Sequence, residues 1–175
     1  MSFDLALLVL RILVGLVLAS HGSQKLLGWF GGPGLTRASG SMEKLGFRPG
    51  RFWALLASGS EFGGGLLVAL GLLTPLAAAG LVAAMLVAIT KAHWKAGFWN
   101  SKGGFEYPLV LLVVSAVIGL SGAHGYSLDA LLERVGFTLP AVPAFLVVLV
   151  LALIVIGIGI ISGNSQRRSE AHRTA

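Results

Sequence analysis

The chain has 175 residues, of which 55% are hydrophobic and only 11% are charged, and its mean hydropathy is +0.87. Soluble domains usually carry about 25% charged residues, and disordered chains are poor in apolar residues, so the composition excludes both classes. The formal net charge is +6, but the basic residues lie between apolar stretches, which is typical of membrane topology rather than of phosphate binding. The composition therefore predicts an integral membrane protein with no nucleic-acid partner.

Cysteine is absent, which excludes disulfides, thiolate metal sites and a thiol relay within the chain. The histidines at 21 and 93 have no spacing typical of a metal or haem site, so no metal is expected. At the N-terminus, Asp4 precedes any basic residue. Since a secretory signal begins with a basic region, this apolar run is predicted to be a retained first span.

Five apolar stretches are long enough to cross about 30 Å of hydrocarbon as helices. Thr74 and Pro75 divide the longest apolar run, because proline suits the first turn of a new helix. The runs are continuous and do not alternate every second residue, so the predicted fold is all-α, a polytopic transmembrane helix bundle and not a barrel. The predicted spans are 5–27, 51–73, 75–93, 106–122 and a fifth within 140–163, followed by a basic tail, 164–175.

Two segments between the spans have the pattern of interfacial helices. Ser127 is suited to cap a short helix, 127–135, whose apolar face excludes Asp129 and Glu133. A weaker amphipathic pattern covers 35–47. The Gly-Gly-Pro-Gly run from Gly31 to Gly34 predicts a turn or a re-entrant bend.

The basic residues are distributed unevenly over the two sides that five spans would create. Arg134 is the only one on the side of the N-terminus, and Arg11 lies inside the first span. Because basic loops stay in the cytoplasm, the pattern predicts the N-terminus outside and the C-terminus inside. Eleven basic residues fall on the predicted cytoplasmic side: Lys25, Arg37, Lys44, Arg48, Arg51, Lys91, Lys95, Lys102, Arg167, Arg168 and Arg173.

Arg11 and Glu61 lie within predicted spans, where an unpaired charge costs several kcal/mol. Arg11 is 14 residues from Lys25, about 21 Å of helix, and Glu61 is 10 residues from Arg51, about 15 Å. We therefore predict an intramembrane ion pair between Arg11 and Glu61. Such a pair either fixes the helix register or serves a function, and an unpaired, protonated Glu61 would instead suit a proton relay or a ligand.

Polar and aromatic residues gather where three spans end on the basic side. Their types suit a small anion or the headgroup of a quinone. Each also has an ordinary structural explanation, as a helix-terminus charge, a snorkelling lysine or an interfacial aromatic residue. The predicted ligand-binding residues are His21, Gln24 and Lys25 in the first span, His93 and Trp94 after the third, and Glu106 and Tyr107 at the start of the fourth.

Several short motifs follow one another along the chain. They are His21-Gly-Ser-Gln-Lys-Leu-Leu-Gly-Trp-Phe-Gly-Gly-Pro-Gly, Met42-Glu-Lys-Leu-Gly-Phe, Glu61-Phe-Gly-Gly-Gly-Leu-Leu, Leu72-Leu-Thr-Pro, His93-Trp, Glu106-Tyr-Pro and Tyr126-Ser-Leu-Asp-Ala-Leu. Together and in this order they resemble the DoxX family, over about residues 5–132. The resemblance implies a four-helix transmembrane domain, 1–136, in a bacterial inner membrane, and the fifth span and tail depart from that pattern.

Some relatives in the family are associated with thiosulfate:quinone oxidoreductase. Another belongs to a mycobacterial membrane complex with superoxide dismutase and a sulfurtransferase. The resemblance thus implies an accessory subunit of a redox system that binds quinone or a soluble oxidoreductase or sulfurtransferase partner. Because the chain has no cysteine and no nucleotide fingerprint, it is not expected to be an autonomous enzyme.

Two other functions stay open at this point. One is a small permease or ligand-binding protein that uses the Arg11 and Glu61 site, and the other is a non-enzymatic scaffold whose basic loops recruit an acidic partner. In the fifth span, Gly159-x-x-x-Gly163 is a motif by which helices approach closely. It predicts either packing against the bundle or formation of a homo-oligomer.

Overall fold

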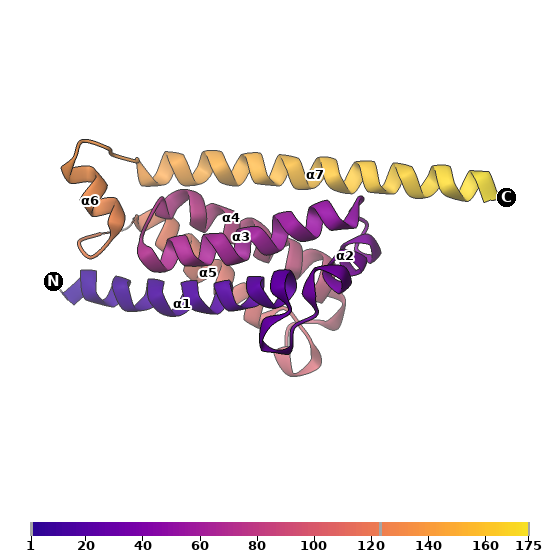
Figure 1. The fold of residues 1–175 in the computed structure, drawn as a ribbon, viewed down its shortest axis with the longest axis horizontal. Helices are drawn as coiled ribbons and strands as arrows, with labels where there is room; N and C mark the ends of the chain where they lie inside the picture. Colours follow the sequence, from indigo (N-terminus) through magenta and orange to yellow (C-terminus); the bar gives the residue numbers. More distant parts are fainter. Residues whose placement is uncertain (1, 123, 175) are drawn as a thin grey trace.

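The computed structural model describes residues 2–122 and 124–174, and the side chains of residues 3–122 and 124–165. Within them the chain forms helices and connecting loops, so the all-α prediction is confirmed. The two ends of the chain lie at opposite ends of the molecule's long axis (Figure 1). The α-helices of the described residues are α1 (Ser2–Leu27), α2 (Gly34–Lys44), α3 (Gly50–Leu70), α4 (Thr74–Val87), α5 (Glu106–Ser121), α6 (Leu128–Arg134) and α7 (Ala141–Thr174).

Four helical stretches of the described chain are long and apolar enough to cross a membrane, which makes this a multi-pass membrane protein. They are Phe3–Leu27, Gly50–Leu70, Thr74–Ala96 and Ala141–Ser165. The third is longer than α4 because a π-helix, η2 (Ala88–His93), and a 3-10 turn, η3 (Trp94–Ala96), continue it. Helix α5, which corresponds to the predicted span 106–122, is apolar but has only 16 residues. The side chains of Arg167, Arg168 and Arg173 in the predicted basic tail lie outside the described side chains.

Helices α1 and α3 pack against each other through small residues. Gly15 faces the backbone of Gly65, and Gly22 faces the backbone of Phe62, so closely that neither glycine has room for a Cβ. Such close approach is how helices associate where lipid removes the hydrophobic driving force. These two contacts set the register between α1 and α3 in the bundle.

The N-terminal end of the bundle is organised by helix α6. Ser127 caps α6 as the sequence predicts, because its hydroxyl accepts a hydrogen bond from the backbone N–H of Ala130 at 3.0 Å. The carboxylate of Asp129 accepts hydrogen bonds from the backbone N–H groups of Leu73 (2.7 Å) and Thr74 (2.9 Å). Leu73, which precedes α4, has no side-chain oxygen that could cap this helix. The cap of α4 therefore comes from α6.

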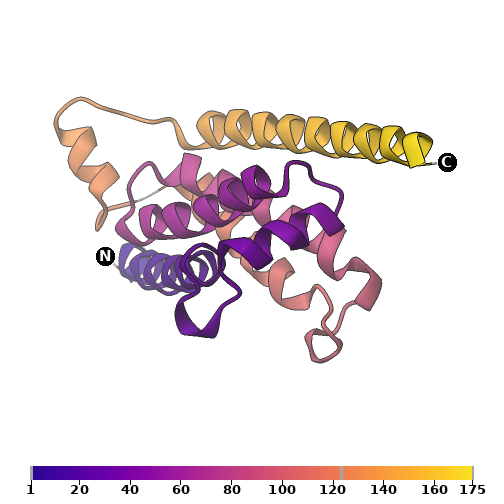
Figure 2. The ribbon, with the colours of Figure 1, turned by 45° about the vertical axis from the view of Figure 1, so that its right-hand side comes forward.

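Helix α7 lies along the outside of the bundle (Figures 1 and 2). Gly159 packs against the Trp53 ring on α3, and Gly163 against the carbonyl of Gly46, each without room for a Cβ. The glycine motif therefore packs α7 against its own bundle, which is the first of the two predicted alternatives. Phe145 of α7 makes a further contact with the bundle, in which its side chain is buried (3% exposed).

Candidate functional site

A groove of about 520 Å³ lies between α1 and α5. His21 on α1 and Tyr107 on α5 meet across it, with 3.2 Å between the ring Nε2 and the phenol Oη. Their ring centroids are 5.8 Å apart. The other lining residues combine an apolar wall with two polar groups: Leu13, Leu16, Val17, Ser20, Gln24 and Phe30. The groove thus presents a small polar cluster beside a larger apolar surface.

The glycine-rich segment after α1 forms one wall of this groove. Gly32 packs on the backbone of Gln24 with no room for a Cβ, and Gly28 has a φ of 73°, where glycine is favoured. This close return directs the short 3-10 turn η1 (Trp29–Gly31), which contains Phe30, towards α1. The predicted turn or re-entrant bend is therefore a turn folded back on α1.

Lys25 lies one helical turn beyond His21 but contacts a different helix. Its Nζ lies 2.6 Å from both carboxylate oxygens of Glu61 on α3. The Glu61 side chain is 3% exposed and the Lys25 side chain is 35% exposed. Each charge therefore has its partner inside the bundle, and Lys25 retains access to its surface.

The predicted pair between Arg11 and Glu61 does not form. Gly15 packs against Gly65 and Gly22 against Phe62, which places Glu61 level with Lys25. Arg11 is 1% exposed and donates from Nη2 to the backbone oxygen of Tyr126 at 2.6 Å. The prediction compared the depths of Arg11 and Glu61 by counting residues from the ends of their helices. That comparison fails because α3 extends past the end of α1 and packs there against α2.

Three other predicted site residues stabilise the loop between α4 and α5. His93 Nδ1 lies 2.7 Å from the carbonyl oxygen of Gly103, and Glu106 accepts a hydrogen bond from the backbone N–H of Asn100 at 3.0 Å. The Trp94 ring stacks on Phe105 with 5.3 Å between centroids and 12° between planes. His93, Trp94 and Glu106 are not among the residues that line the groove.

Asp129 was missed by the sequence reasoning, which placed it outside the apolar face of α6. Its carboxylate caps α4, and its backbone N–H donates at 2.8 Å to the carbonyl of Gly71, against which the Arg11 guanidinium lies. The sequence contains one signal for this role of Asp129: Leu73, directly before α4, has no side-chain acceptor to cap that helix. Arg11, Gly71 and Asp129 thus form a structural cluster towards the end of the bundle away from His21 and Tyr107.

Helix α1, which forms one side of the groove, lies in a region whose sequence matches a known protein family. The profile of the DoxX family matches residues 6–94, about half of the chain. The chain belongs to the DoxX family. The matched region contains His21, Gln24, Lys25 and Glu61, whereas Tyr107, Asp129 and α7 lie outside it.

This DoxX protein is also similar to a protein of Bacillus subtilis (strain 168) named "Putative oxidoreductase CatD". The two are 28% identical over 134 residues, which cover 73% of this chain and 87% of the relative. No solved structure gives a significant match to the chain. The homology is therefore distant, and it extends beyond the four helices of the profile match.

Proposed function

We propose that this DoxX protein is a membrane subunit of a redox system and binds a quinone headgroup in the groove between α1 and α5. The observation that carries the proposal is the pair formed by His21 Nε2 and Tyr107 Oη, 3.2 Å apart, at the edge of an apolar groove. A quinone has two carbonyl oxygens that accept hydrogen bonds, and the imidazole, phenol and Gln24 amide all carry donors. Leu13, Leu16 and Val17 provide the surface for its hydrocarbon tail.

Lys25 and Glu61 have a supporting role in this proposal. They satisfy each other, with both Nζ–oxygen distances at 2.6 Å, so neither is left to hold the headgroup. They tie α1 to α3 one turn from His21, which fixes the position of the groove wall. A permease site formed jointly by Arg11 and Glu61 has no support, because the two side chains bind different partners.

The electrons for a bound quinone come from another protein in this proposal. The chain carries no cysteine and needs a partner that holds a redox cofactor. The name of the Bacillus subtilis relative, an oxidoreductase, agrees with this redox setting. The partner would be a soluble oxidoreductase or sulfurtransferase that docks on Lys91 and Lys95, at the end of the third span, and on Lys102 in the loop that follows.

We further infer that α5 completes five crossings, with the N-terminus outside and the C-terminus in the cytoplasm of a bacterial inner membrane. Sixteen residues of helix measure about 24 Å, and local thinning of the bilayer accommodates a short span. An odd number of crossings agrees with termini at opposite ends of the long axis (Figure 1). The positive-inside rule then assigns the basic end to the cytoplasm.

The groove is tested by measuring the quinone retained by protein purified in mild detergent, using native mass spectrometry. We expect the wild type to retain quinone, and His21→Ala and Tyr107→Phe to retain several-fold less. His93→Ala is the matched control, since His93 bonds to the Gly103 carbonyl outside the groove. Quinone-free wild-type protein that also fails to bind added ubiquinone would overturn the proposal, as would equal retention by all variants.

The partner is tested separately by co-purification. Reversal of charge at Lys95 and Lys102 should release a bound oxidoreductase, while reversal at Arg134, at the other end of the molecule, should not. An unchanged set of co-purifying proteins would reject a partner docked on these lysines.

A further inference from the structure

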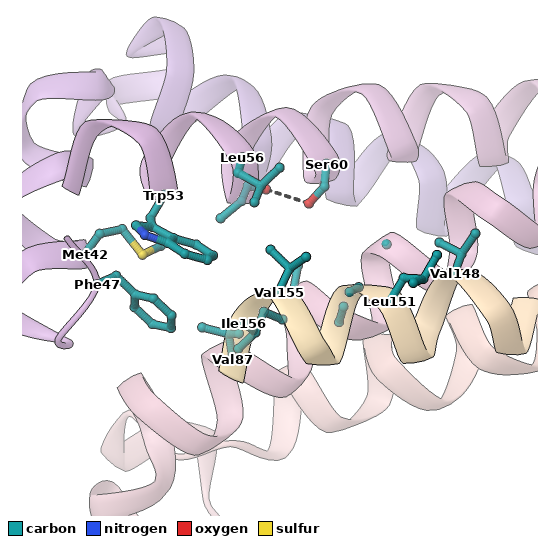
Figure 3. A pocket seen from close by; sticks show the side chains of 15 residues that line it. Met42, Phe47, Trp53, Leu56, Ser60, Val87, Val148, Leu151, Val155 and Ile156 are labelled. Atoms are coloured by element: carbon teal, nitrogen blue, oxygen red, sulfur yellow. Dashed lines mark hydrogen bonds between the residues drawn. The ribbon is translucent and has the colours of Figure 1, made fainter. Parts of the chain in front are cut away.

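A second cavity, of about 320 Å³, lies between α3, α4 and α7. It shares no lining residue with the groove that contains His21. In Figure 3, Met42, Phe47 and Trp53 gather at one end of the cavity, and Val148 and Leu151 of α7 lie at the other. Helix α7, which lies outside the region of the family match, thus forms one complete wall.

The lining of this cavity is suited to hydrocarbon alone. Ser60 is its one hydroxyl-bearing residue, and its Oγ donates to the Ala57 carbonyl of its own helix at 2.9 Å (Figure 3). The remaining side chains are aliphatic or aromatic or belong to methionine, with Trp53 8% exposed. Apart from the indole N–H of Trp53, these side chains offer a polar headgroup no free hydrogen-bonding group, so the part of a ligand that enters is apolar.

The dimensions of the cavity indicate a single extended chain. Its lining residues run from Trp53 to Ser60 on α3 and from Val148 to Ile156 on α7, a rise of about 10–12 Å along each helix. Divided by that length, a volume of 320 Å³ gives a mean cross-section of about 27–32 Å². A slot of this width admits one linear hydrocarbon chain that lies parallel to the helices.

The segment 42–53, which contributes Met42, Phe47 and Trp53 to one end of the cavity, is basic. The segment 42–53 carries Lys44, Arg48 and Arg51 against one acidic residue, Glu43, and so has two net positive charges. Arg51 is exposed at the start of α3. Clusters of basic residues at the membrane surface attract anionic lipid headgroups.

We propose that this cavity binds one acyl chain of an anionic phospholipid, whose headgroup lies at the basic segment 42–53. The lipid chain adds to the contact between α7 and the bundle, which the protein itself makes along α4 and α5 and at Gly159 and Gly163. The site is independent of the proposed quinone groove, so failure of either proposal leaves the other intact.

The test uses Trp53 as a reporter of chain binding. Trp29, Trp94 and Trp99 are replaced by phenylalanine, which leaves Trp53 as the sole tryptophan. The protein is reconstituted in phosphatidylcholine containing a small fraction of phosphatidylglycerol or phosphatidylcholine with brominated acyl chains, which quench tryptophan fluorescence on contact. We expect brominated phosphatidylglycerol to quench about fivefold more effectively at equal mole fraction.

A cavity-filling variant decides whether quenching arises in the cavity. Gly80 lines it, and a Cβ there would meet only the Ser60 Cβ at 4.0 Å, so Gly80→Leu fits while it fills the space. It should remove the preference for phosphatidylglycerol, and Arg51→Gln should reduce it. Gly157→Leu is the control, because Gly157 lies on α7 outside the lining and has open space around it.

Three outcomes would overturn the proposal. One is equal quenching by the two brominated lipids, and another is a preference that survives Gly80→Leu. The third concerns added ubiquinone. If it relieves the quenching by brominated phosphatidylglycerol at amounts that leave quenching by brominated phosphatidylcholine unchanged, the cavity binds a quinone tail instead.

Discussion

Lys25 on α1 and Glu61 on α3 form an ion pair in which Nζ lies 2.6 Å from each carboxylate oxygen. The pair is asymmetric, because the glutamate side chain is 3% exposed and the lysine side chain 35%. Removal of the lysine would leave a buried carboxylate, whereas removal of the glutamate charge would leave a cation that reaches the surface. The two partners therefore differ in how well the bundle tolerates their loss.

We predict that Lys25→Met destabilises the protein more than Glu61→Gln. Breaking a buried pair costs about 3–5 kcal/mol when the remaining charge stays buried, and Lys25→Met approaches that range. Glu61→Gln should cost about 1 kcal/mol, since Lys25 can extend to water. The measurement is the unfolding free energy in detergent, and equal destabilisation by the two variants would contradict the asymmetry.

The same pair allows a second, independent prediction. The double variant Lys25→Met, Glu61→Leu should be more stable than Lys25→Met alone, because it leaves no buried charge unpaired. Thermal melts of the wild type, Lys25→Met, Glu61→Leu and the double variant measure this. Additive losses would mean that the two side chains do not interact in the membrane.

Asp129 should contribute to stability through the start of α4. Asp129→Ala removes the acceptor of the Leu73 and Thr74 N–H groups, and loss of a helix cap costs about 0.5–2 kcal/mol. Glu133→Ala, an exposed change on the same helix, is the control and should be nearly neutral. Chemical unfolding compares them, and a neutral Asp129→Ala would show that water replaces the cap.

The docking of α7 should depend on the absence of a side chain at Gly159. Gly159→Val places two methyl groups against Trp53, where no Cβ fits, and overpacking costs about 1–3 kcal/mol. Gly157→Val, with open space around it, introduces the same residue without that clash. Trp53 fluorescence and the melting temperature should change in the first variant alone, and equal behaviour of the pair would reject the contact.

The inferred orientation can be tested because the chain has no native cysteine. We expect Glu133→Cys to react with a membrane-impermeant maleimide in intact cells, and Lys102→Cys to react only after permeabilisation. The opposite pattern would reverse the topology. Labelling of both residues in intact cells would place them on one side and remove α5 as a crossing.

Much of the helical architecture was predictable, because hydropathy and helix boundaries depend on nearby residues. Proline at the start of α4 and serine before α6 act within one helical turn, so Pro75 and Ser127 were read correctly. The level of Glu61 depends instead on the contacts of Gly15 with Gly65 and of Gly22 with Phe62. Such contacts join distant segments, and the spacing of residues along one helix does not specify them.

The residues of the candidate site were also predicted only in part. His21 and Tyr107 were both selected from their chemistry and helix ends, and the structure brings them together. His93 and Glu106 were expected beside them because their helices end on the same side. Their loop instead folds on itself, with His93 bonded to Gly103 and Glu106 to Asn100, since backbone groups in a loop need local partners.

The cap on α4 has a consequence for biosynthesis. Asp129 follows Thr74 by 55 positions, so the ribosome adds it long after α4 has been translated. During that interval the first turn of α4 exists without the carboxylate that its Leu73 and Thr74 amides bind in the finished protein. Helix α4 therefore reaches its capped structure only after α6 has been synthesised. A nascent chain that stops before residue 129 lacks the hydrogen bonds that cap α4.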